Sequence, residues 1–584
     1  MRHRFAFILL ALLASTIFVP ALVTGEVFSL RDHFDYFQPL RFFTAEQLLT
    51  GKIPFWNPYS ASGEPWFANP QTGVFYPPAW LFLVLPFETA YMLFLLVHLV
   101  ILGWGAYLLF ARTASEGAAI AGAAALMFSG PVLSLMDVQN NLATLAWIPL
   151  ALWCAAEGAW RRGGIVLALA FLGGEPFFAA VAALLYVCVR RNRDVLGTAL
   201  VAFGVSAVQL LPFLEFVSTS DRAGGMGDAL ILHDSMSAGD WLRAAVPGAT
   251  GQQFIPVVYL GVVVLILAVI GSTTARRSNA TRAWLALLAV SALISMGPHL
   301  LTLLPLTIFR YPARLVPIAA IAVAALAVAG WERVRPNRRW VDLVLVLAVV
   351  ADLLPRATPL LQTAEFRRDV VPYPLQIGTR GKVLRFGDID PQHRRAWMAG
   401  YLNLYDHRFD AFTAAPLASE RYLRMYRELL QRPTFANFAN AGIVHIITQY
   451  ELPAPWFAVA SAENVWVYEN RQAFPMAAHF SPGSQALRHA SWTLDTSSAR
   501  ISVNAPRDGV LVLRQQAARG WKVTVDGVPA PALVIDGLFR GVDVKAGRHE
   551  VVWMYDPPLF SAGCVMTIIT LLALQISVFV KRSR

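Results

Sequence analysis

Long apolar runs separated by short clusters of arginine fill most of the first 355 residues of this 584-residue chain. A run of about 20 apolar residues is long enough to cross a bilayer as a helix. Charged residues make up 15% of the chain, whereas a soluble domain usually carries about 25%. They are scarce before residue 356 and ordinary from there to about residue 557. The sequence therefore predicts a helical membrane module, 1–355, followed by a water-soluble region.

The predicted membrane spans share an apolar composition and a length close to that needed to cross the bilayer. They lie near residues 5–23, 89–111, 117–135, 141–157, 195–217, 254–272, 282–297, 312–330, 339–355 and 558–580. The first run follows Arg2 and Arg4 and lacks a small-x-small cleavage site, so we interpret it as an uncleaved span rather than a signal peptide. Segment 164–189 has two interpretations, one kinked helix or two short passes.

The distribution of Arg and Lys favours two passes, because cytoplasmic loops collect basic residues. A turn at Gly173-Gly174-Glu175-Pro176 puts all the basic clusters on one side of the membrane, whereas a single helix moves the 190–193 cluster and those after it to the other side. Gly-Gly and Pro break helices, and the turn removes Glu175 from the hydrocarbon, where an acid is costly. In the single-helix alternative, Glu175 faces the helix bundle. Two passes give about 12 spans with both chain ends cytoplasmic.

The external parts are then 24–88, several short turns and loops, and the large region 356–557. Between 356 and 485, strand patterns alternate with the pattern of an amphipathic helix at 417–431. The strand patterns lie at 382–386, 443–448 and 464–468. We predict a mixed α/β region over 356–485.

Residues 486–557 carry seven short strand patterns, separated by turn pairs such as Asp526-Gly527 and Asp536-Gly537. Short strands at this spacing predict a β-sandwich. Residues 558–584 form the last span and a basic cytoplasmic tail. The predicted fold is thus a polytopic α-helical membrane protein of about 12 spans, with an extracytoplasmic α/β region and a C-terminal β-sandwich.

The formal net charge of +11 does not indicate a nucleic-acid partner, because most of the excess arginine lies in the short clusters between apolar runs. Those clusters are typical of membrane topology signals, and the expected surroundings are membrane lipids. The three cysteines also lie in apolar runs and form no CxxC pair, which predicts buried small residues rather than disulfides.

The first external segment, 24–88, is rich in aromatic residues and prolines, which predicts a packed lid on the membrane surface rather than a linker. Within this lid we group Trp56, Asn57 and Tyr76 with the residues that face a substrate. Asp32 and Asp35 follow the first span by about one helical turn. Two carboxylates there can act as a base or hold a divalent cation, Mg or Mn. The alternative is that both acids are simply solvated at the helix exit.

Polar residues from other loops come out on the same external face in this topology. Asp137, Gln139 and Glu175 lie in two short turns, and Arg310 and Arg314 lie at the external start of a span. Acids beside fixed guanidinium groups at a membrane mouth suit a phosphate-bearing lipid, which predicts donor phosphate binding by the two arginines. The alternatives are arginines that anchor in lipid headgroups, a polar turn at Asp137 and Gln139, and a helix cap at Glu175.

The first external segment and the C-terminal part also carry a resemblance to a known family. The matching motifs are Arg31-Asp32 with Tyr36 and Pro39, Gly51-x-x-Pro54-x-Trp56-Asn57-Pro58, Gly63-x-Pro65, Ala68-Asn69-Pro70-Gln71, Phe75-Tyr76-Pro77, Phe309-Arg310-Tyr311-Pro312-Ala313-Arg314, Val467-Tyr468-Glu469-Asn470, Gly520-Trp521, Val525-Asp526-Gly527 and Ala546-Gly547-Arg548-His549-Glu550-Val551. With these motifs the chain resembles the YfhO-like bacterial membrane proteins over nearly its whole length. That family belongs to the GT-C class of polytopic glycosyltransferases.

The resemblance implies an inverting enzyme that moves a sugar from a polyprenyl-phosphate-linked donor to a cell-envelope glycan, lipid or polymer. The reaction would occur on the extracytoplasmic side of the bacterial inner membrane. Asp32 matches the catalytic acid of the family, whereas Asp35 lies where the family varies. Trp521 could bind acceptor glycan if it is exposed, or belong to the core. Two other functions stay open: a flippase or transporter for a lipid-linked saccharide, and a non-catalytic envelope-assembly protein.

Overall fold

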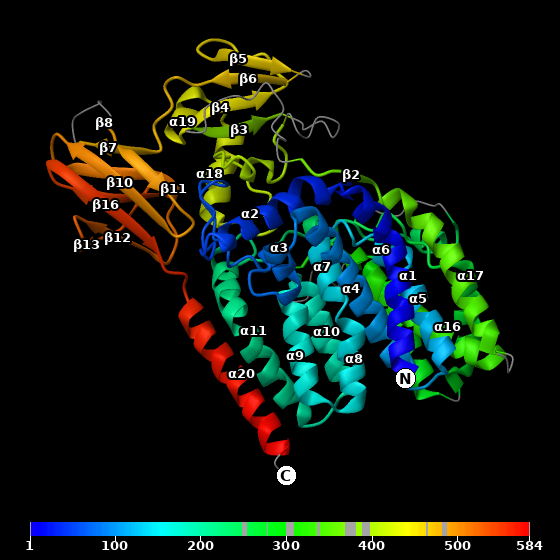
Figure 1. Ribbon diagram of the computed structural model, residues 1–584. Helices are drawn as coiled ribbons and strands as arrows, with labels where there is room; N and C mark the ends of the chain where they lie inside the picture. Colours follow the sequence, from blue (N-terminus) through cyan, green and yellow to red (C-terminus); the bar gives the residue numbers. More distant parts are fainter. Residues whose placement is uncertain are drawn as a thin grey trace.

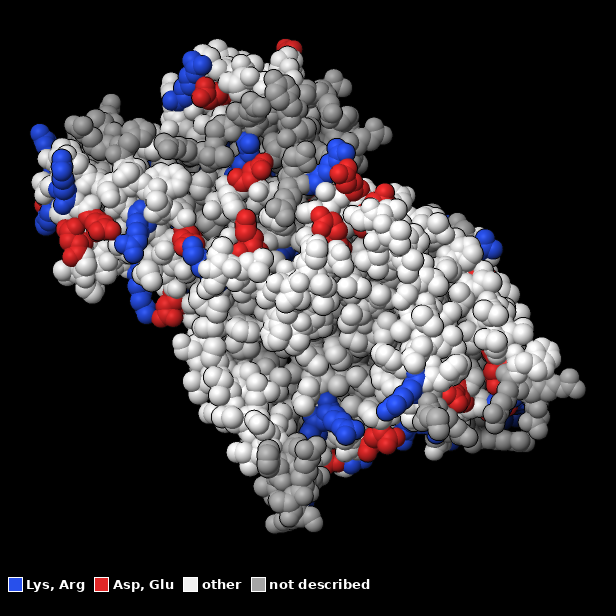
Figure 2. Space-filling view, in the orientation of Figure 1, with Lys and Arg blue, Asp and Glu red and all other residues white. Residues whose placement is uncertain are grey.

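A computed structural model describes residues 2–247, 254–276, 278–298, 309–335, 339–367, 381–387, 397–462, 465–481 and 488–582. A layer of helices carries strand-rich regions at one of its ends, and both chain termini lie toward the opposite end (Figure 1). In the view of Figure 2, charged side chains gather on the strand-rich regions and at the far end of the helical layer, and the described surface of the band between is mostly uncharged. This distribution is that of a membrane module with one large region outside it.

The helical layer contains α1 and the helices from α4 to α11, α14 to α17 and α20. Their bounds are α1 Arg2–Thr24, α4 Phe87–Phe110, α5 Glu116–Met127, α6 Gly130–Leu133, α7 Gln139–Leu145, α8 Ile148–Glu157, α9 Trp160–Leu172, α10 Pro176–Val189, α11 Asp194–Thr219, α14 Val262–Ser272, α15 Asn279–Ser295, α16 Val316–Val334, α17 Arg339–Ala357 and α20 Phe560–Arg582. Within the described residues, five helical stretches are long and apolar enough to cross a membrane: His3–Thr24, Phe87–Phe110, Asp194–Thr219, Pro312–Val334 and Phe560–Ser577.

Each predicted span coincides with helix, but three of them are interrupted. The span at 117–135 breaks between α5 and α6, the span at 141–157 breaks between α7 and α8, and helix α14 begins only at Val262. Gly130 and Pro149 lie at two of these breaks, where Gly and Pro are common. The number of membrane crossings therefore stays a prediction.

Segment 164–189 is a helical hairpin rather than one kinked helix. Helices α9 and α10 contact each other on either side of the turn, and Gly174 adopts a left-handed conformation with φ of 102°. The Glu175 side chain accepts a hydrogen bond from the Phe177 backbone N–H and so caps α10. Pro176 at the first helical position completes the start signal. The two-helix interpretation of this segment is therefore correct.

The first external segment is packed, in agreement with its composition. It contains the π-helical turn η1 (His33–Phe37), α2 (Gln38–Leu49) and α3 (Leu81–Val84). Its strand β1 (Glu26–Phe28) pairs with β2 (Thr363–Glu365), so the ends of α1 and α17 lie on the same side of the helical layer. Between α11 and α14, a second external segment contains α12 (Asp228–Ile231) and α13 (Ala238–Arg243).

The α/β region has a four-stranded sheet in the order β3-β4-β6-β5, in which β3 and β4 are parallel. The strands are β3 Lys382–Phe386, β4 Ile443–Thr448, β5 Phe457–Ala462 and β6 Val465–Glu469. Helices α18 (Glu420–Gln431) and α19 (Phe435–Asn440) precede β4. The predicted strands and amphipathic helix of this region all coincide with these elements.

The C-terminal region has two five-stranded sheets, ordered β13-β12-β16-β10-β9 and β14-β15-β11-β7-β8. The strands are β7 Ala477–Phe480, β8 Arg488–His489, β9 Ser491–Leu494, β10 Ser498–Ala505, β11 Gly509–Gln516, β12 Trp521–Val525, β13 Val528–Ala530, β14 Leu533–Ile535, β15 Phe539–Val544 and β16 Gly547–Tyr555. Both sheets contribute to one apolar core. Strand β7 precedes the predicted boundary at residue 486 and pairs with β11.

Trp521 belongs to this core, which was one of the two alternatives for this residue. The indole is buried, lies edge-on to Trp56 at 5.3 Å between ring centroids, and faces the Arg540 guanidinium at 3.6 Å. Trp56 reaches this core from the first external segment, and its backbone N–H donates to the Thr496 carbonyl at 2.7 Å. The C-terminal sheets thus hold the middle of the first external segment.

Close packing of α14 on α16 predicts a strong effect of a single methyl group. A Cβ at Gly330 would lie 1.9 Å from the Leu267 carbonyl oxygen, so Gly330→Ala must push the two helices apart. We expect a loss of about 1–3 kcal/mol, seen as a lower unfolding temperature of the detergent-solubilised protein. Gly239→Ala is the control, since its nearest neighbour would be 3.5 Å away and Ala favours the helix. Equal unfolding temperatures for both variants would contradict the packing of α14 on α16.

Candidate functional site

Two cavities meet where the helical layer joins the external regions. A polar cavity of about 770 Å³ lies among the first external segment, the α6–α7 turn and the α/β region. An apolar groove of about 550 Å³ runs between α9, α10 and α11. Six residues line both: Gln71, Glu175, Arg222, Arg310, Arg314 and Pro416. We call these six residues the neck.

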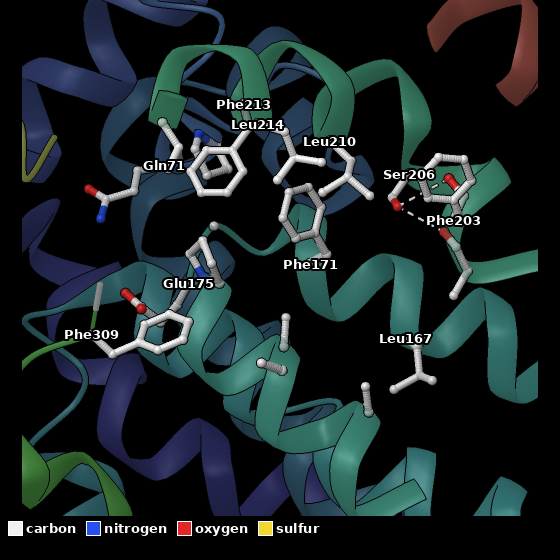
Figure 3. A pocket seen from close by; sticks show the side chains of 18 of the residues that line it. Gln71, Leu167, Phe171, Glu175, Phe203, Ser206, Leu210, Phe213, Leu214 and Phe309 are labelled. Carbon is white, nitrogen blue, oxygen red and sulfur yellow. Dashed lines mark hydrogen bonds between the residues drawn. The ribbon is translucent and has the colours of Figure 1, made fainter. Parts of the chain in front are cut away.

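Figure 3 shows the groove from close by, with Gln71, Glu175 and Phe309 at one end and Leu167, Phe203 and Ser206 toward the other. Phe171 and Phe213 approach each other from α9 and α11 at 5.8 Å between ring centroids. The groove is therefore mostly apolar along its length, and its charged residues lie at the neck. Such a shape suits a long hydrocarbon chain with a charged end.

The two predicted catalytic acids line the polar cavity. Asp32 precedes the π-helical turn η1 and is partly exposed, whereas Asp35 lies inside this turn and is buried. Their neighbour His33 is a poor base, because burial and then the positive charge of Arg31 lower the pKa of its imidazole to about 3. His33 is neutral and its Nδ1 contacts the Tyr91 hydroxyl at 2.8 Å.

The predicted arginines lie in the neck, and Arg314 is held there by a buried ion pair. Its Nη1 lies 2.9 Å from Glu175 Oε1, and Asn140 donates to the other Glu175 oxygen at 3.0 Å. Arg310 stacks on the Tyr311 ring at 4.5 Å. Glu175 therefore both caps α10 and orients a guanidinium toward the cavities. The structure brings Asp32, Asp35, Glu175 and the two arginines to one cavity wall.

Arg222 is a third neck arginine, which the sequence analysis did not single out. It follows α11, donates to the Pro416 carbonyl at 2.8 Å, and has its pKa lowered by burial and then by the charge of Arg310. The sequence signal was available, because arginine in a short external loop goes against the usual cytoplasmic bias. Three guanidinium groups against the Glu175 carboxylate leave the neck with a formal excess of two positive charges.

Three non-glycine residues on the polar cavity wall have left-handed backbones: Arg31 at φ 53°, Asp234 at φ 57° and Tyr311 at φ 64°. Such conformations cost about 1–3 kcal/mol each and persist where the surrounding structure enforces them. Arg31 directly precedes Asp32, and Tyr311 follows Arg310. The strain therefore lies beside the acids and beside the neck.

Asp137 and Gln139 are buried behind the cavity rather than on its wall. Asp137 lies 3.0 Å from the Arg31 guanidinium, yet burial outweighs this pairing and raises the pKa of its carboxyl to about 7. Gln139 is fully buried, and its side chain has no hydrogen-bond partner among the described residues. Asn140 and Asn141 line the cavity instead. The α6–α7 turn does reach the site, through Asn140 and Asn141 rather than through Asp137 and Gln139.

Trp56, Asn57 and Tyr76, which were expected to face a substrate, line neither the polar cavity nor the apolar groove. Trp56 is in the core of the C-terminal sheets. Asn57 is buried and donates to Glu64 Oε1 at 3.0 Å. The Tyr76 hydroxyl contacts His98 Nε2 at 2.6 Å and accepts from the Trp147 indole at 2.8 Å. All three side chains make buried contacts with other segments of the chain.

The predicted divalent cation would have few protein ligands. Within the described residues, no group of three or more His, Cys, Asp or Glu side chains could enclose a metal ion. Asp32 and Asp35, the pair predicted to hold such an ion, line the polar cavity, as do Glu175, Asp221 and Asp234. A Mg²⁺ ion usually takes one or two carboxylates and completes its shell with water and substrate phosphate oxygens, so this pair fits that pattern.

Comparison with known proteins gives a fold and a family match. The model of glycosyltransferase family 87 matches residues 74–296. No curated protein matches the sequence. The cryo-EM structure of arabinofuranosyltransferase AftD from Mycobacteria is similar, with a TM-score of 0.54 at 12% identity over 95% of this chain and 57% of AftD. A mutant of AftD gives 0.52 at 11% identity over 95% and 60% of the two chains.

The Archaeoglobus fulgidus oligosaccharyltransferase in its apo form also matches, with a TM-score of 0.42 at 11% identity over 76% of this chain and 69% of that chain. The likeness to AftD shows that the chain shares the fold of this arabinofuranosyltransferase. The predicted GT-C fold is therefore confirmed, and the narrower YfhO-like assignment stays a prediction. The chain spans 57% of the length of AftD, so it corresponds to part of that larger protein.

Glu64 connects the first external segment to the α/β region and predicts a pH dependence. It is buried and accepts hydrogen bonds from Asn57, Thr413 and Tyr401. Burial raises the pKa of its carboxyl from an ordinary 4.5 to about 7. The folded protein therefore holds a proton that the unfolded chain releases between these values, and stability falls as pH rises through this window.

We expect Glu64→Gln to flatten the fall in stability between about pH 5 and pH 7. Since one pKa unit corresponds to about 1.4 kcal/mol, the change is on the order of 3 kcal/mol. The measurement is the thermal unfolding of the detergent-solubilised protein across this range. Glu428→Gln on the exposed face of α18 is the matched control and should leave the slope unchanged. An unaltered slope in Glu64→Gln would show that this carboxyl titrates normally.

Proposed function

We propose that this protein is a membrane glycosyltransferase that moves a sugar from a polyprenyl-phosphate-linked donor to an acceptor outside the cytoplasm. The observation that carries this proposal is the neck, where an arginine cluster joins an apolar groove to a cavity lined by Asp32 and Asp35. The GT-C fold and the match to glycosyltransferase family 87 support the same activity. The expected acceptor is a glycan, lipid or polymer of the cell envelope, and the expected location is a bacterial inner membrane.

The donor would lie across the neck. Its prenyl chain would occupy the groove between α9, α10 and α11, where burial of apolar surface favours binding. Its phosphate would lie among Arg222, Arg310 and Arg314, whose excess positive charge it neutralises. The sugar would then extend into the polar cavity, toward the two acids.

The reaction would be a direct displacement at the anomeric carbon. An acceptor hydroxyl oxygen attacks C1 of the sugar while its proton passes to the Asp32 carboxylate, with Asp35 as the second acid of the pair. The bond between C1 and the phosphate oxygen breaks, and the electron pair leaves with the lipid phosphate. The neck arginines stabilise the charge on this leaving group. Displacement in one step inverts the configuration at C1.

A divalent cation, if the enzyme uses one, would be held by Asp32 and Asp35, and it would supply positive charge near the leaving phosphate. The α/β region would exclude water, because its residues 412–418 cover the polar cavity. A flippase would need polar groups along a path near the middle of the membrane. Here the polar cavity touches the external region, which favours transfer over transport.

The central test is Asp32→Asn in the purified full-length protein. We expect this variant to lose at least 10³-fold of its transfer rate, since the acceptor proton then has no base to receive it. The assay offers radiolabelled polyprenyl phosphate sugars with envelope glycans and measures sugar transfer. Asp543→Asn, at an exposed position of β15, is the control and should transfer at the wild-type rate. Full activity of Asp32→Asn would remove this acid from the mechanism.

Arg310→Ala tests the place of the donor phosphate. Loss of a charge-assisted hydrogen bond costs about 1.5–3 kcal/mol, so we expect polyprenyl phosphate to bind about 10–100-fold more weakly. Arg421→Ala on the exposed face of α18 should bind normally. Unchanged affinity in Arg310→Ala, measured by displacement of a labelled polyprenyl phosphate, would place the phosphate elsewhere.

A further inference from the structure

We propose that the Gly400-Tyr401 turn of the α/β region is a positioning element for Asp35, so that the external region completes the catalytic cavity. This inference rests on the proposed function, because it assigns a role within the same site. Gly400 follows Asp35 by 365 positions in the chain. Neither residue carries chemistry of its own in the transfer reaction.

A direct hydrogen bond joins the turn to the acid. The Tyr401 backbone N–H donates to the Asp35 carbonyl oxygen at 2.6 Å. The bond fixes the backbone of the residue whose side chain lines the polar cavity. Because a backbone atom is held, the position of the Asp35 Cα is set by the external region as well as by η1.

Glycine at position 400 is required for this contact. Its backbone is left-handed at φ 62°, and a Cβ would lie 2.0 Å from the Asp35 carbonyl oxygen and 3.0 Å from the Asp35 Cβ. Any other residue would push the turn and η1 apart by more than an ångström to restore ordinary contact distances. Gly400 and its neighbour Ala399 also line the polar cavity, so the turn is part of the cavity wall.

The Tyr401 side chain holds the turn against the first external segment. Its ring stacks on Tyr36 at 5.3 Å between centroids, and Trp66 packs edge-on at the same distance. Its hydroxyl donates to Glu64 Oε1 at 3.0 Å. Glu64 also accepts from Thr413, another residue of the polar cavity wall, at 2.6 Å. One buried acid thus ties both cavity-lining parts of the α/β region to the acid-bearing segment.

Rate depends steeply on such positioning, because a displacement of about 1 Å at a reacting group can cost about 10²-fold in rate. In the proposed site, binding of the lipid phosphate depends on the neck arginines, which lie in other segments of the chain than the turn. A positioning role therefore predicts a lower kcat with an unchanged affinity for polyprenyl phosphate. A merely structural role predicts loss of both together.

The first experiment compares Gly400→Ala with Gly537→Ala in the full-length protein. Gly537 has a similar left-handed backbone at φ 69°, and a Cβ there meets nothing within 4 Å. We expect Gly400→Ala to lower kcat about 10²-fold with polyprenyl phosphate affinity within twofold of wild type, and Gly537→Ala to change neither. A wild-type kcat in Gly400→Ala would overturn the proposal.

Two substitutions at Tyr401 keep the proposal testable if Gly400→Ala does not fold. Tyr401→Phe keeps the ring stack on Tyr36 and the backbone N–H, whereas Tyr401→Ala removes the stack. We expect Tyr401→Ala to lower kcat at least tenfold, and Tyr401→Phe to recover most of the wild-type value. Equal kcat values in the two variants would contradict positioning through the ring.

A third measurement does not depend on transfer. In a chain whose Cys154, Cys188 and Cys564 are replaced by alanine, Asp35→Cys offers one thiol on the cavity wall. We expect Gly400→Ala to change its labelling rate with a water-soluble methanethiosulfonate by at least fivefold, while Gly537→Ala leaves the rate unchanged. An unchanged rate in Gly400→Ala would refute positioning. A changed labelling rate, together with no sugar transfer by the protein that retains Asp35, would refute the proposed function alone.

Discussion

The buried ion pair between Arg314 and Glu175 fixes two charged side chains at one place in the helical layer. A guanidinium taken out of water without a partner is very costly, and breaking a buried pair costs about 3–5 kcal/mol. Here the pair joins the start of α10 to the 3-10 turn that begins the Pro312–Val334 stretch, and Asn140 brings the α6–α7 turn to the same carboxylate. Three elements that are distant in sequence therefore converge at the neck, and the groove and the polar cavity open on either side of it.

The first external segment connects the two acids to both strand-rich regions. One of its ends carries Asp32 and Asp35, and Trp56 is inserted into the core of the C-terminal sheets. Shortly after Trp56, the Pro58 and Ala61 carbonyls accept hydrogen bonds from Gln515 and Gln516 of β11 at 2.9 and 2.7 Å. Because the segment is held at several points, the acids gain the fixed geometry that electrostatic stabilisation of a transition state requires.

Local signals predicted the elements well, and long-range contacts explain what they missed. Apolar runs and arginine clusters gave the helices, and Gly173-Gly174 with Pro176 gave the hairpin, because these signals act within a few residues. Asp32 and Arg310 line the same cavity, as expected from their predicted location on one side of the membrane. Trp56 was expected to face a substrate and instead fills a core, because an aromatic residue in a loop looks the same in sequence whether it contacts a glycan or another domain. The same ambiguity left two alternatives for Trp521. Gly400 carried no local signal, since its constraint comes from Asp35.

The C-terminal sheets are better explained as support than as a glycan-binding surface. Their two largest aromatic residues on β12 and β16, Trp521 and Trp553, are buried against the Arg540 guanidinium, and their core accepts Trp56 from the membrane-proximal segment. Burying these side chains contributes stability only while the first external segment stays docked, since Trp56 otherwise leaves a cavity in that core. Docking of the sheets and fixing of the acid-bearing segment are therefore one cooperative event, which ties a region far from the cavity to the geometry within it.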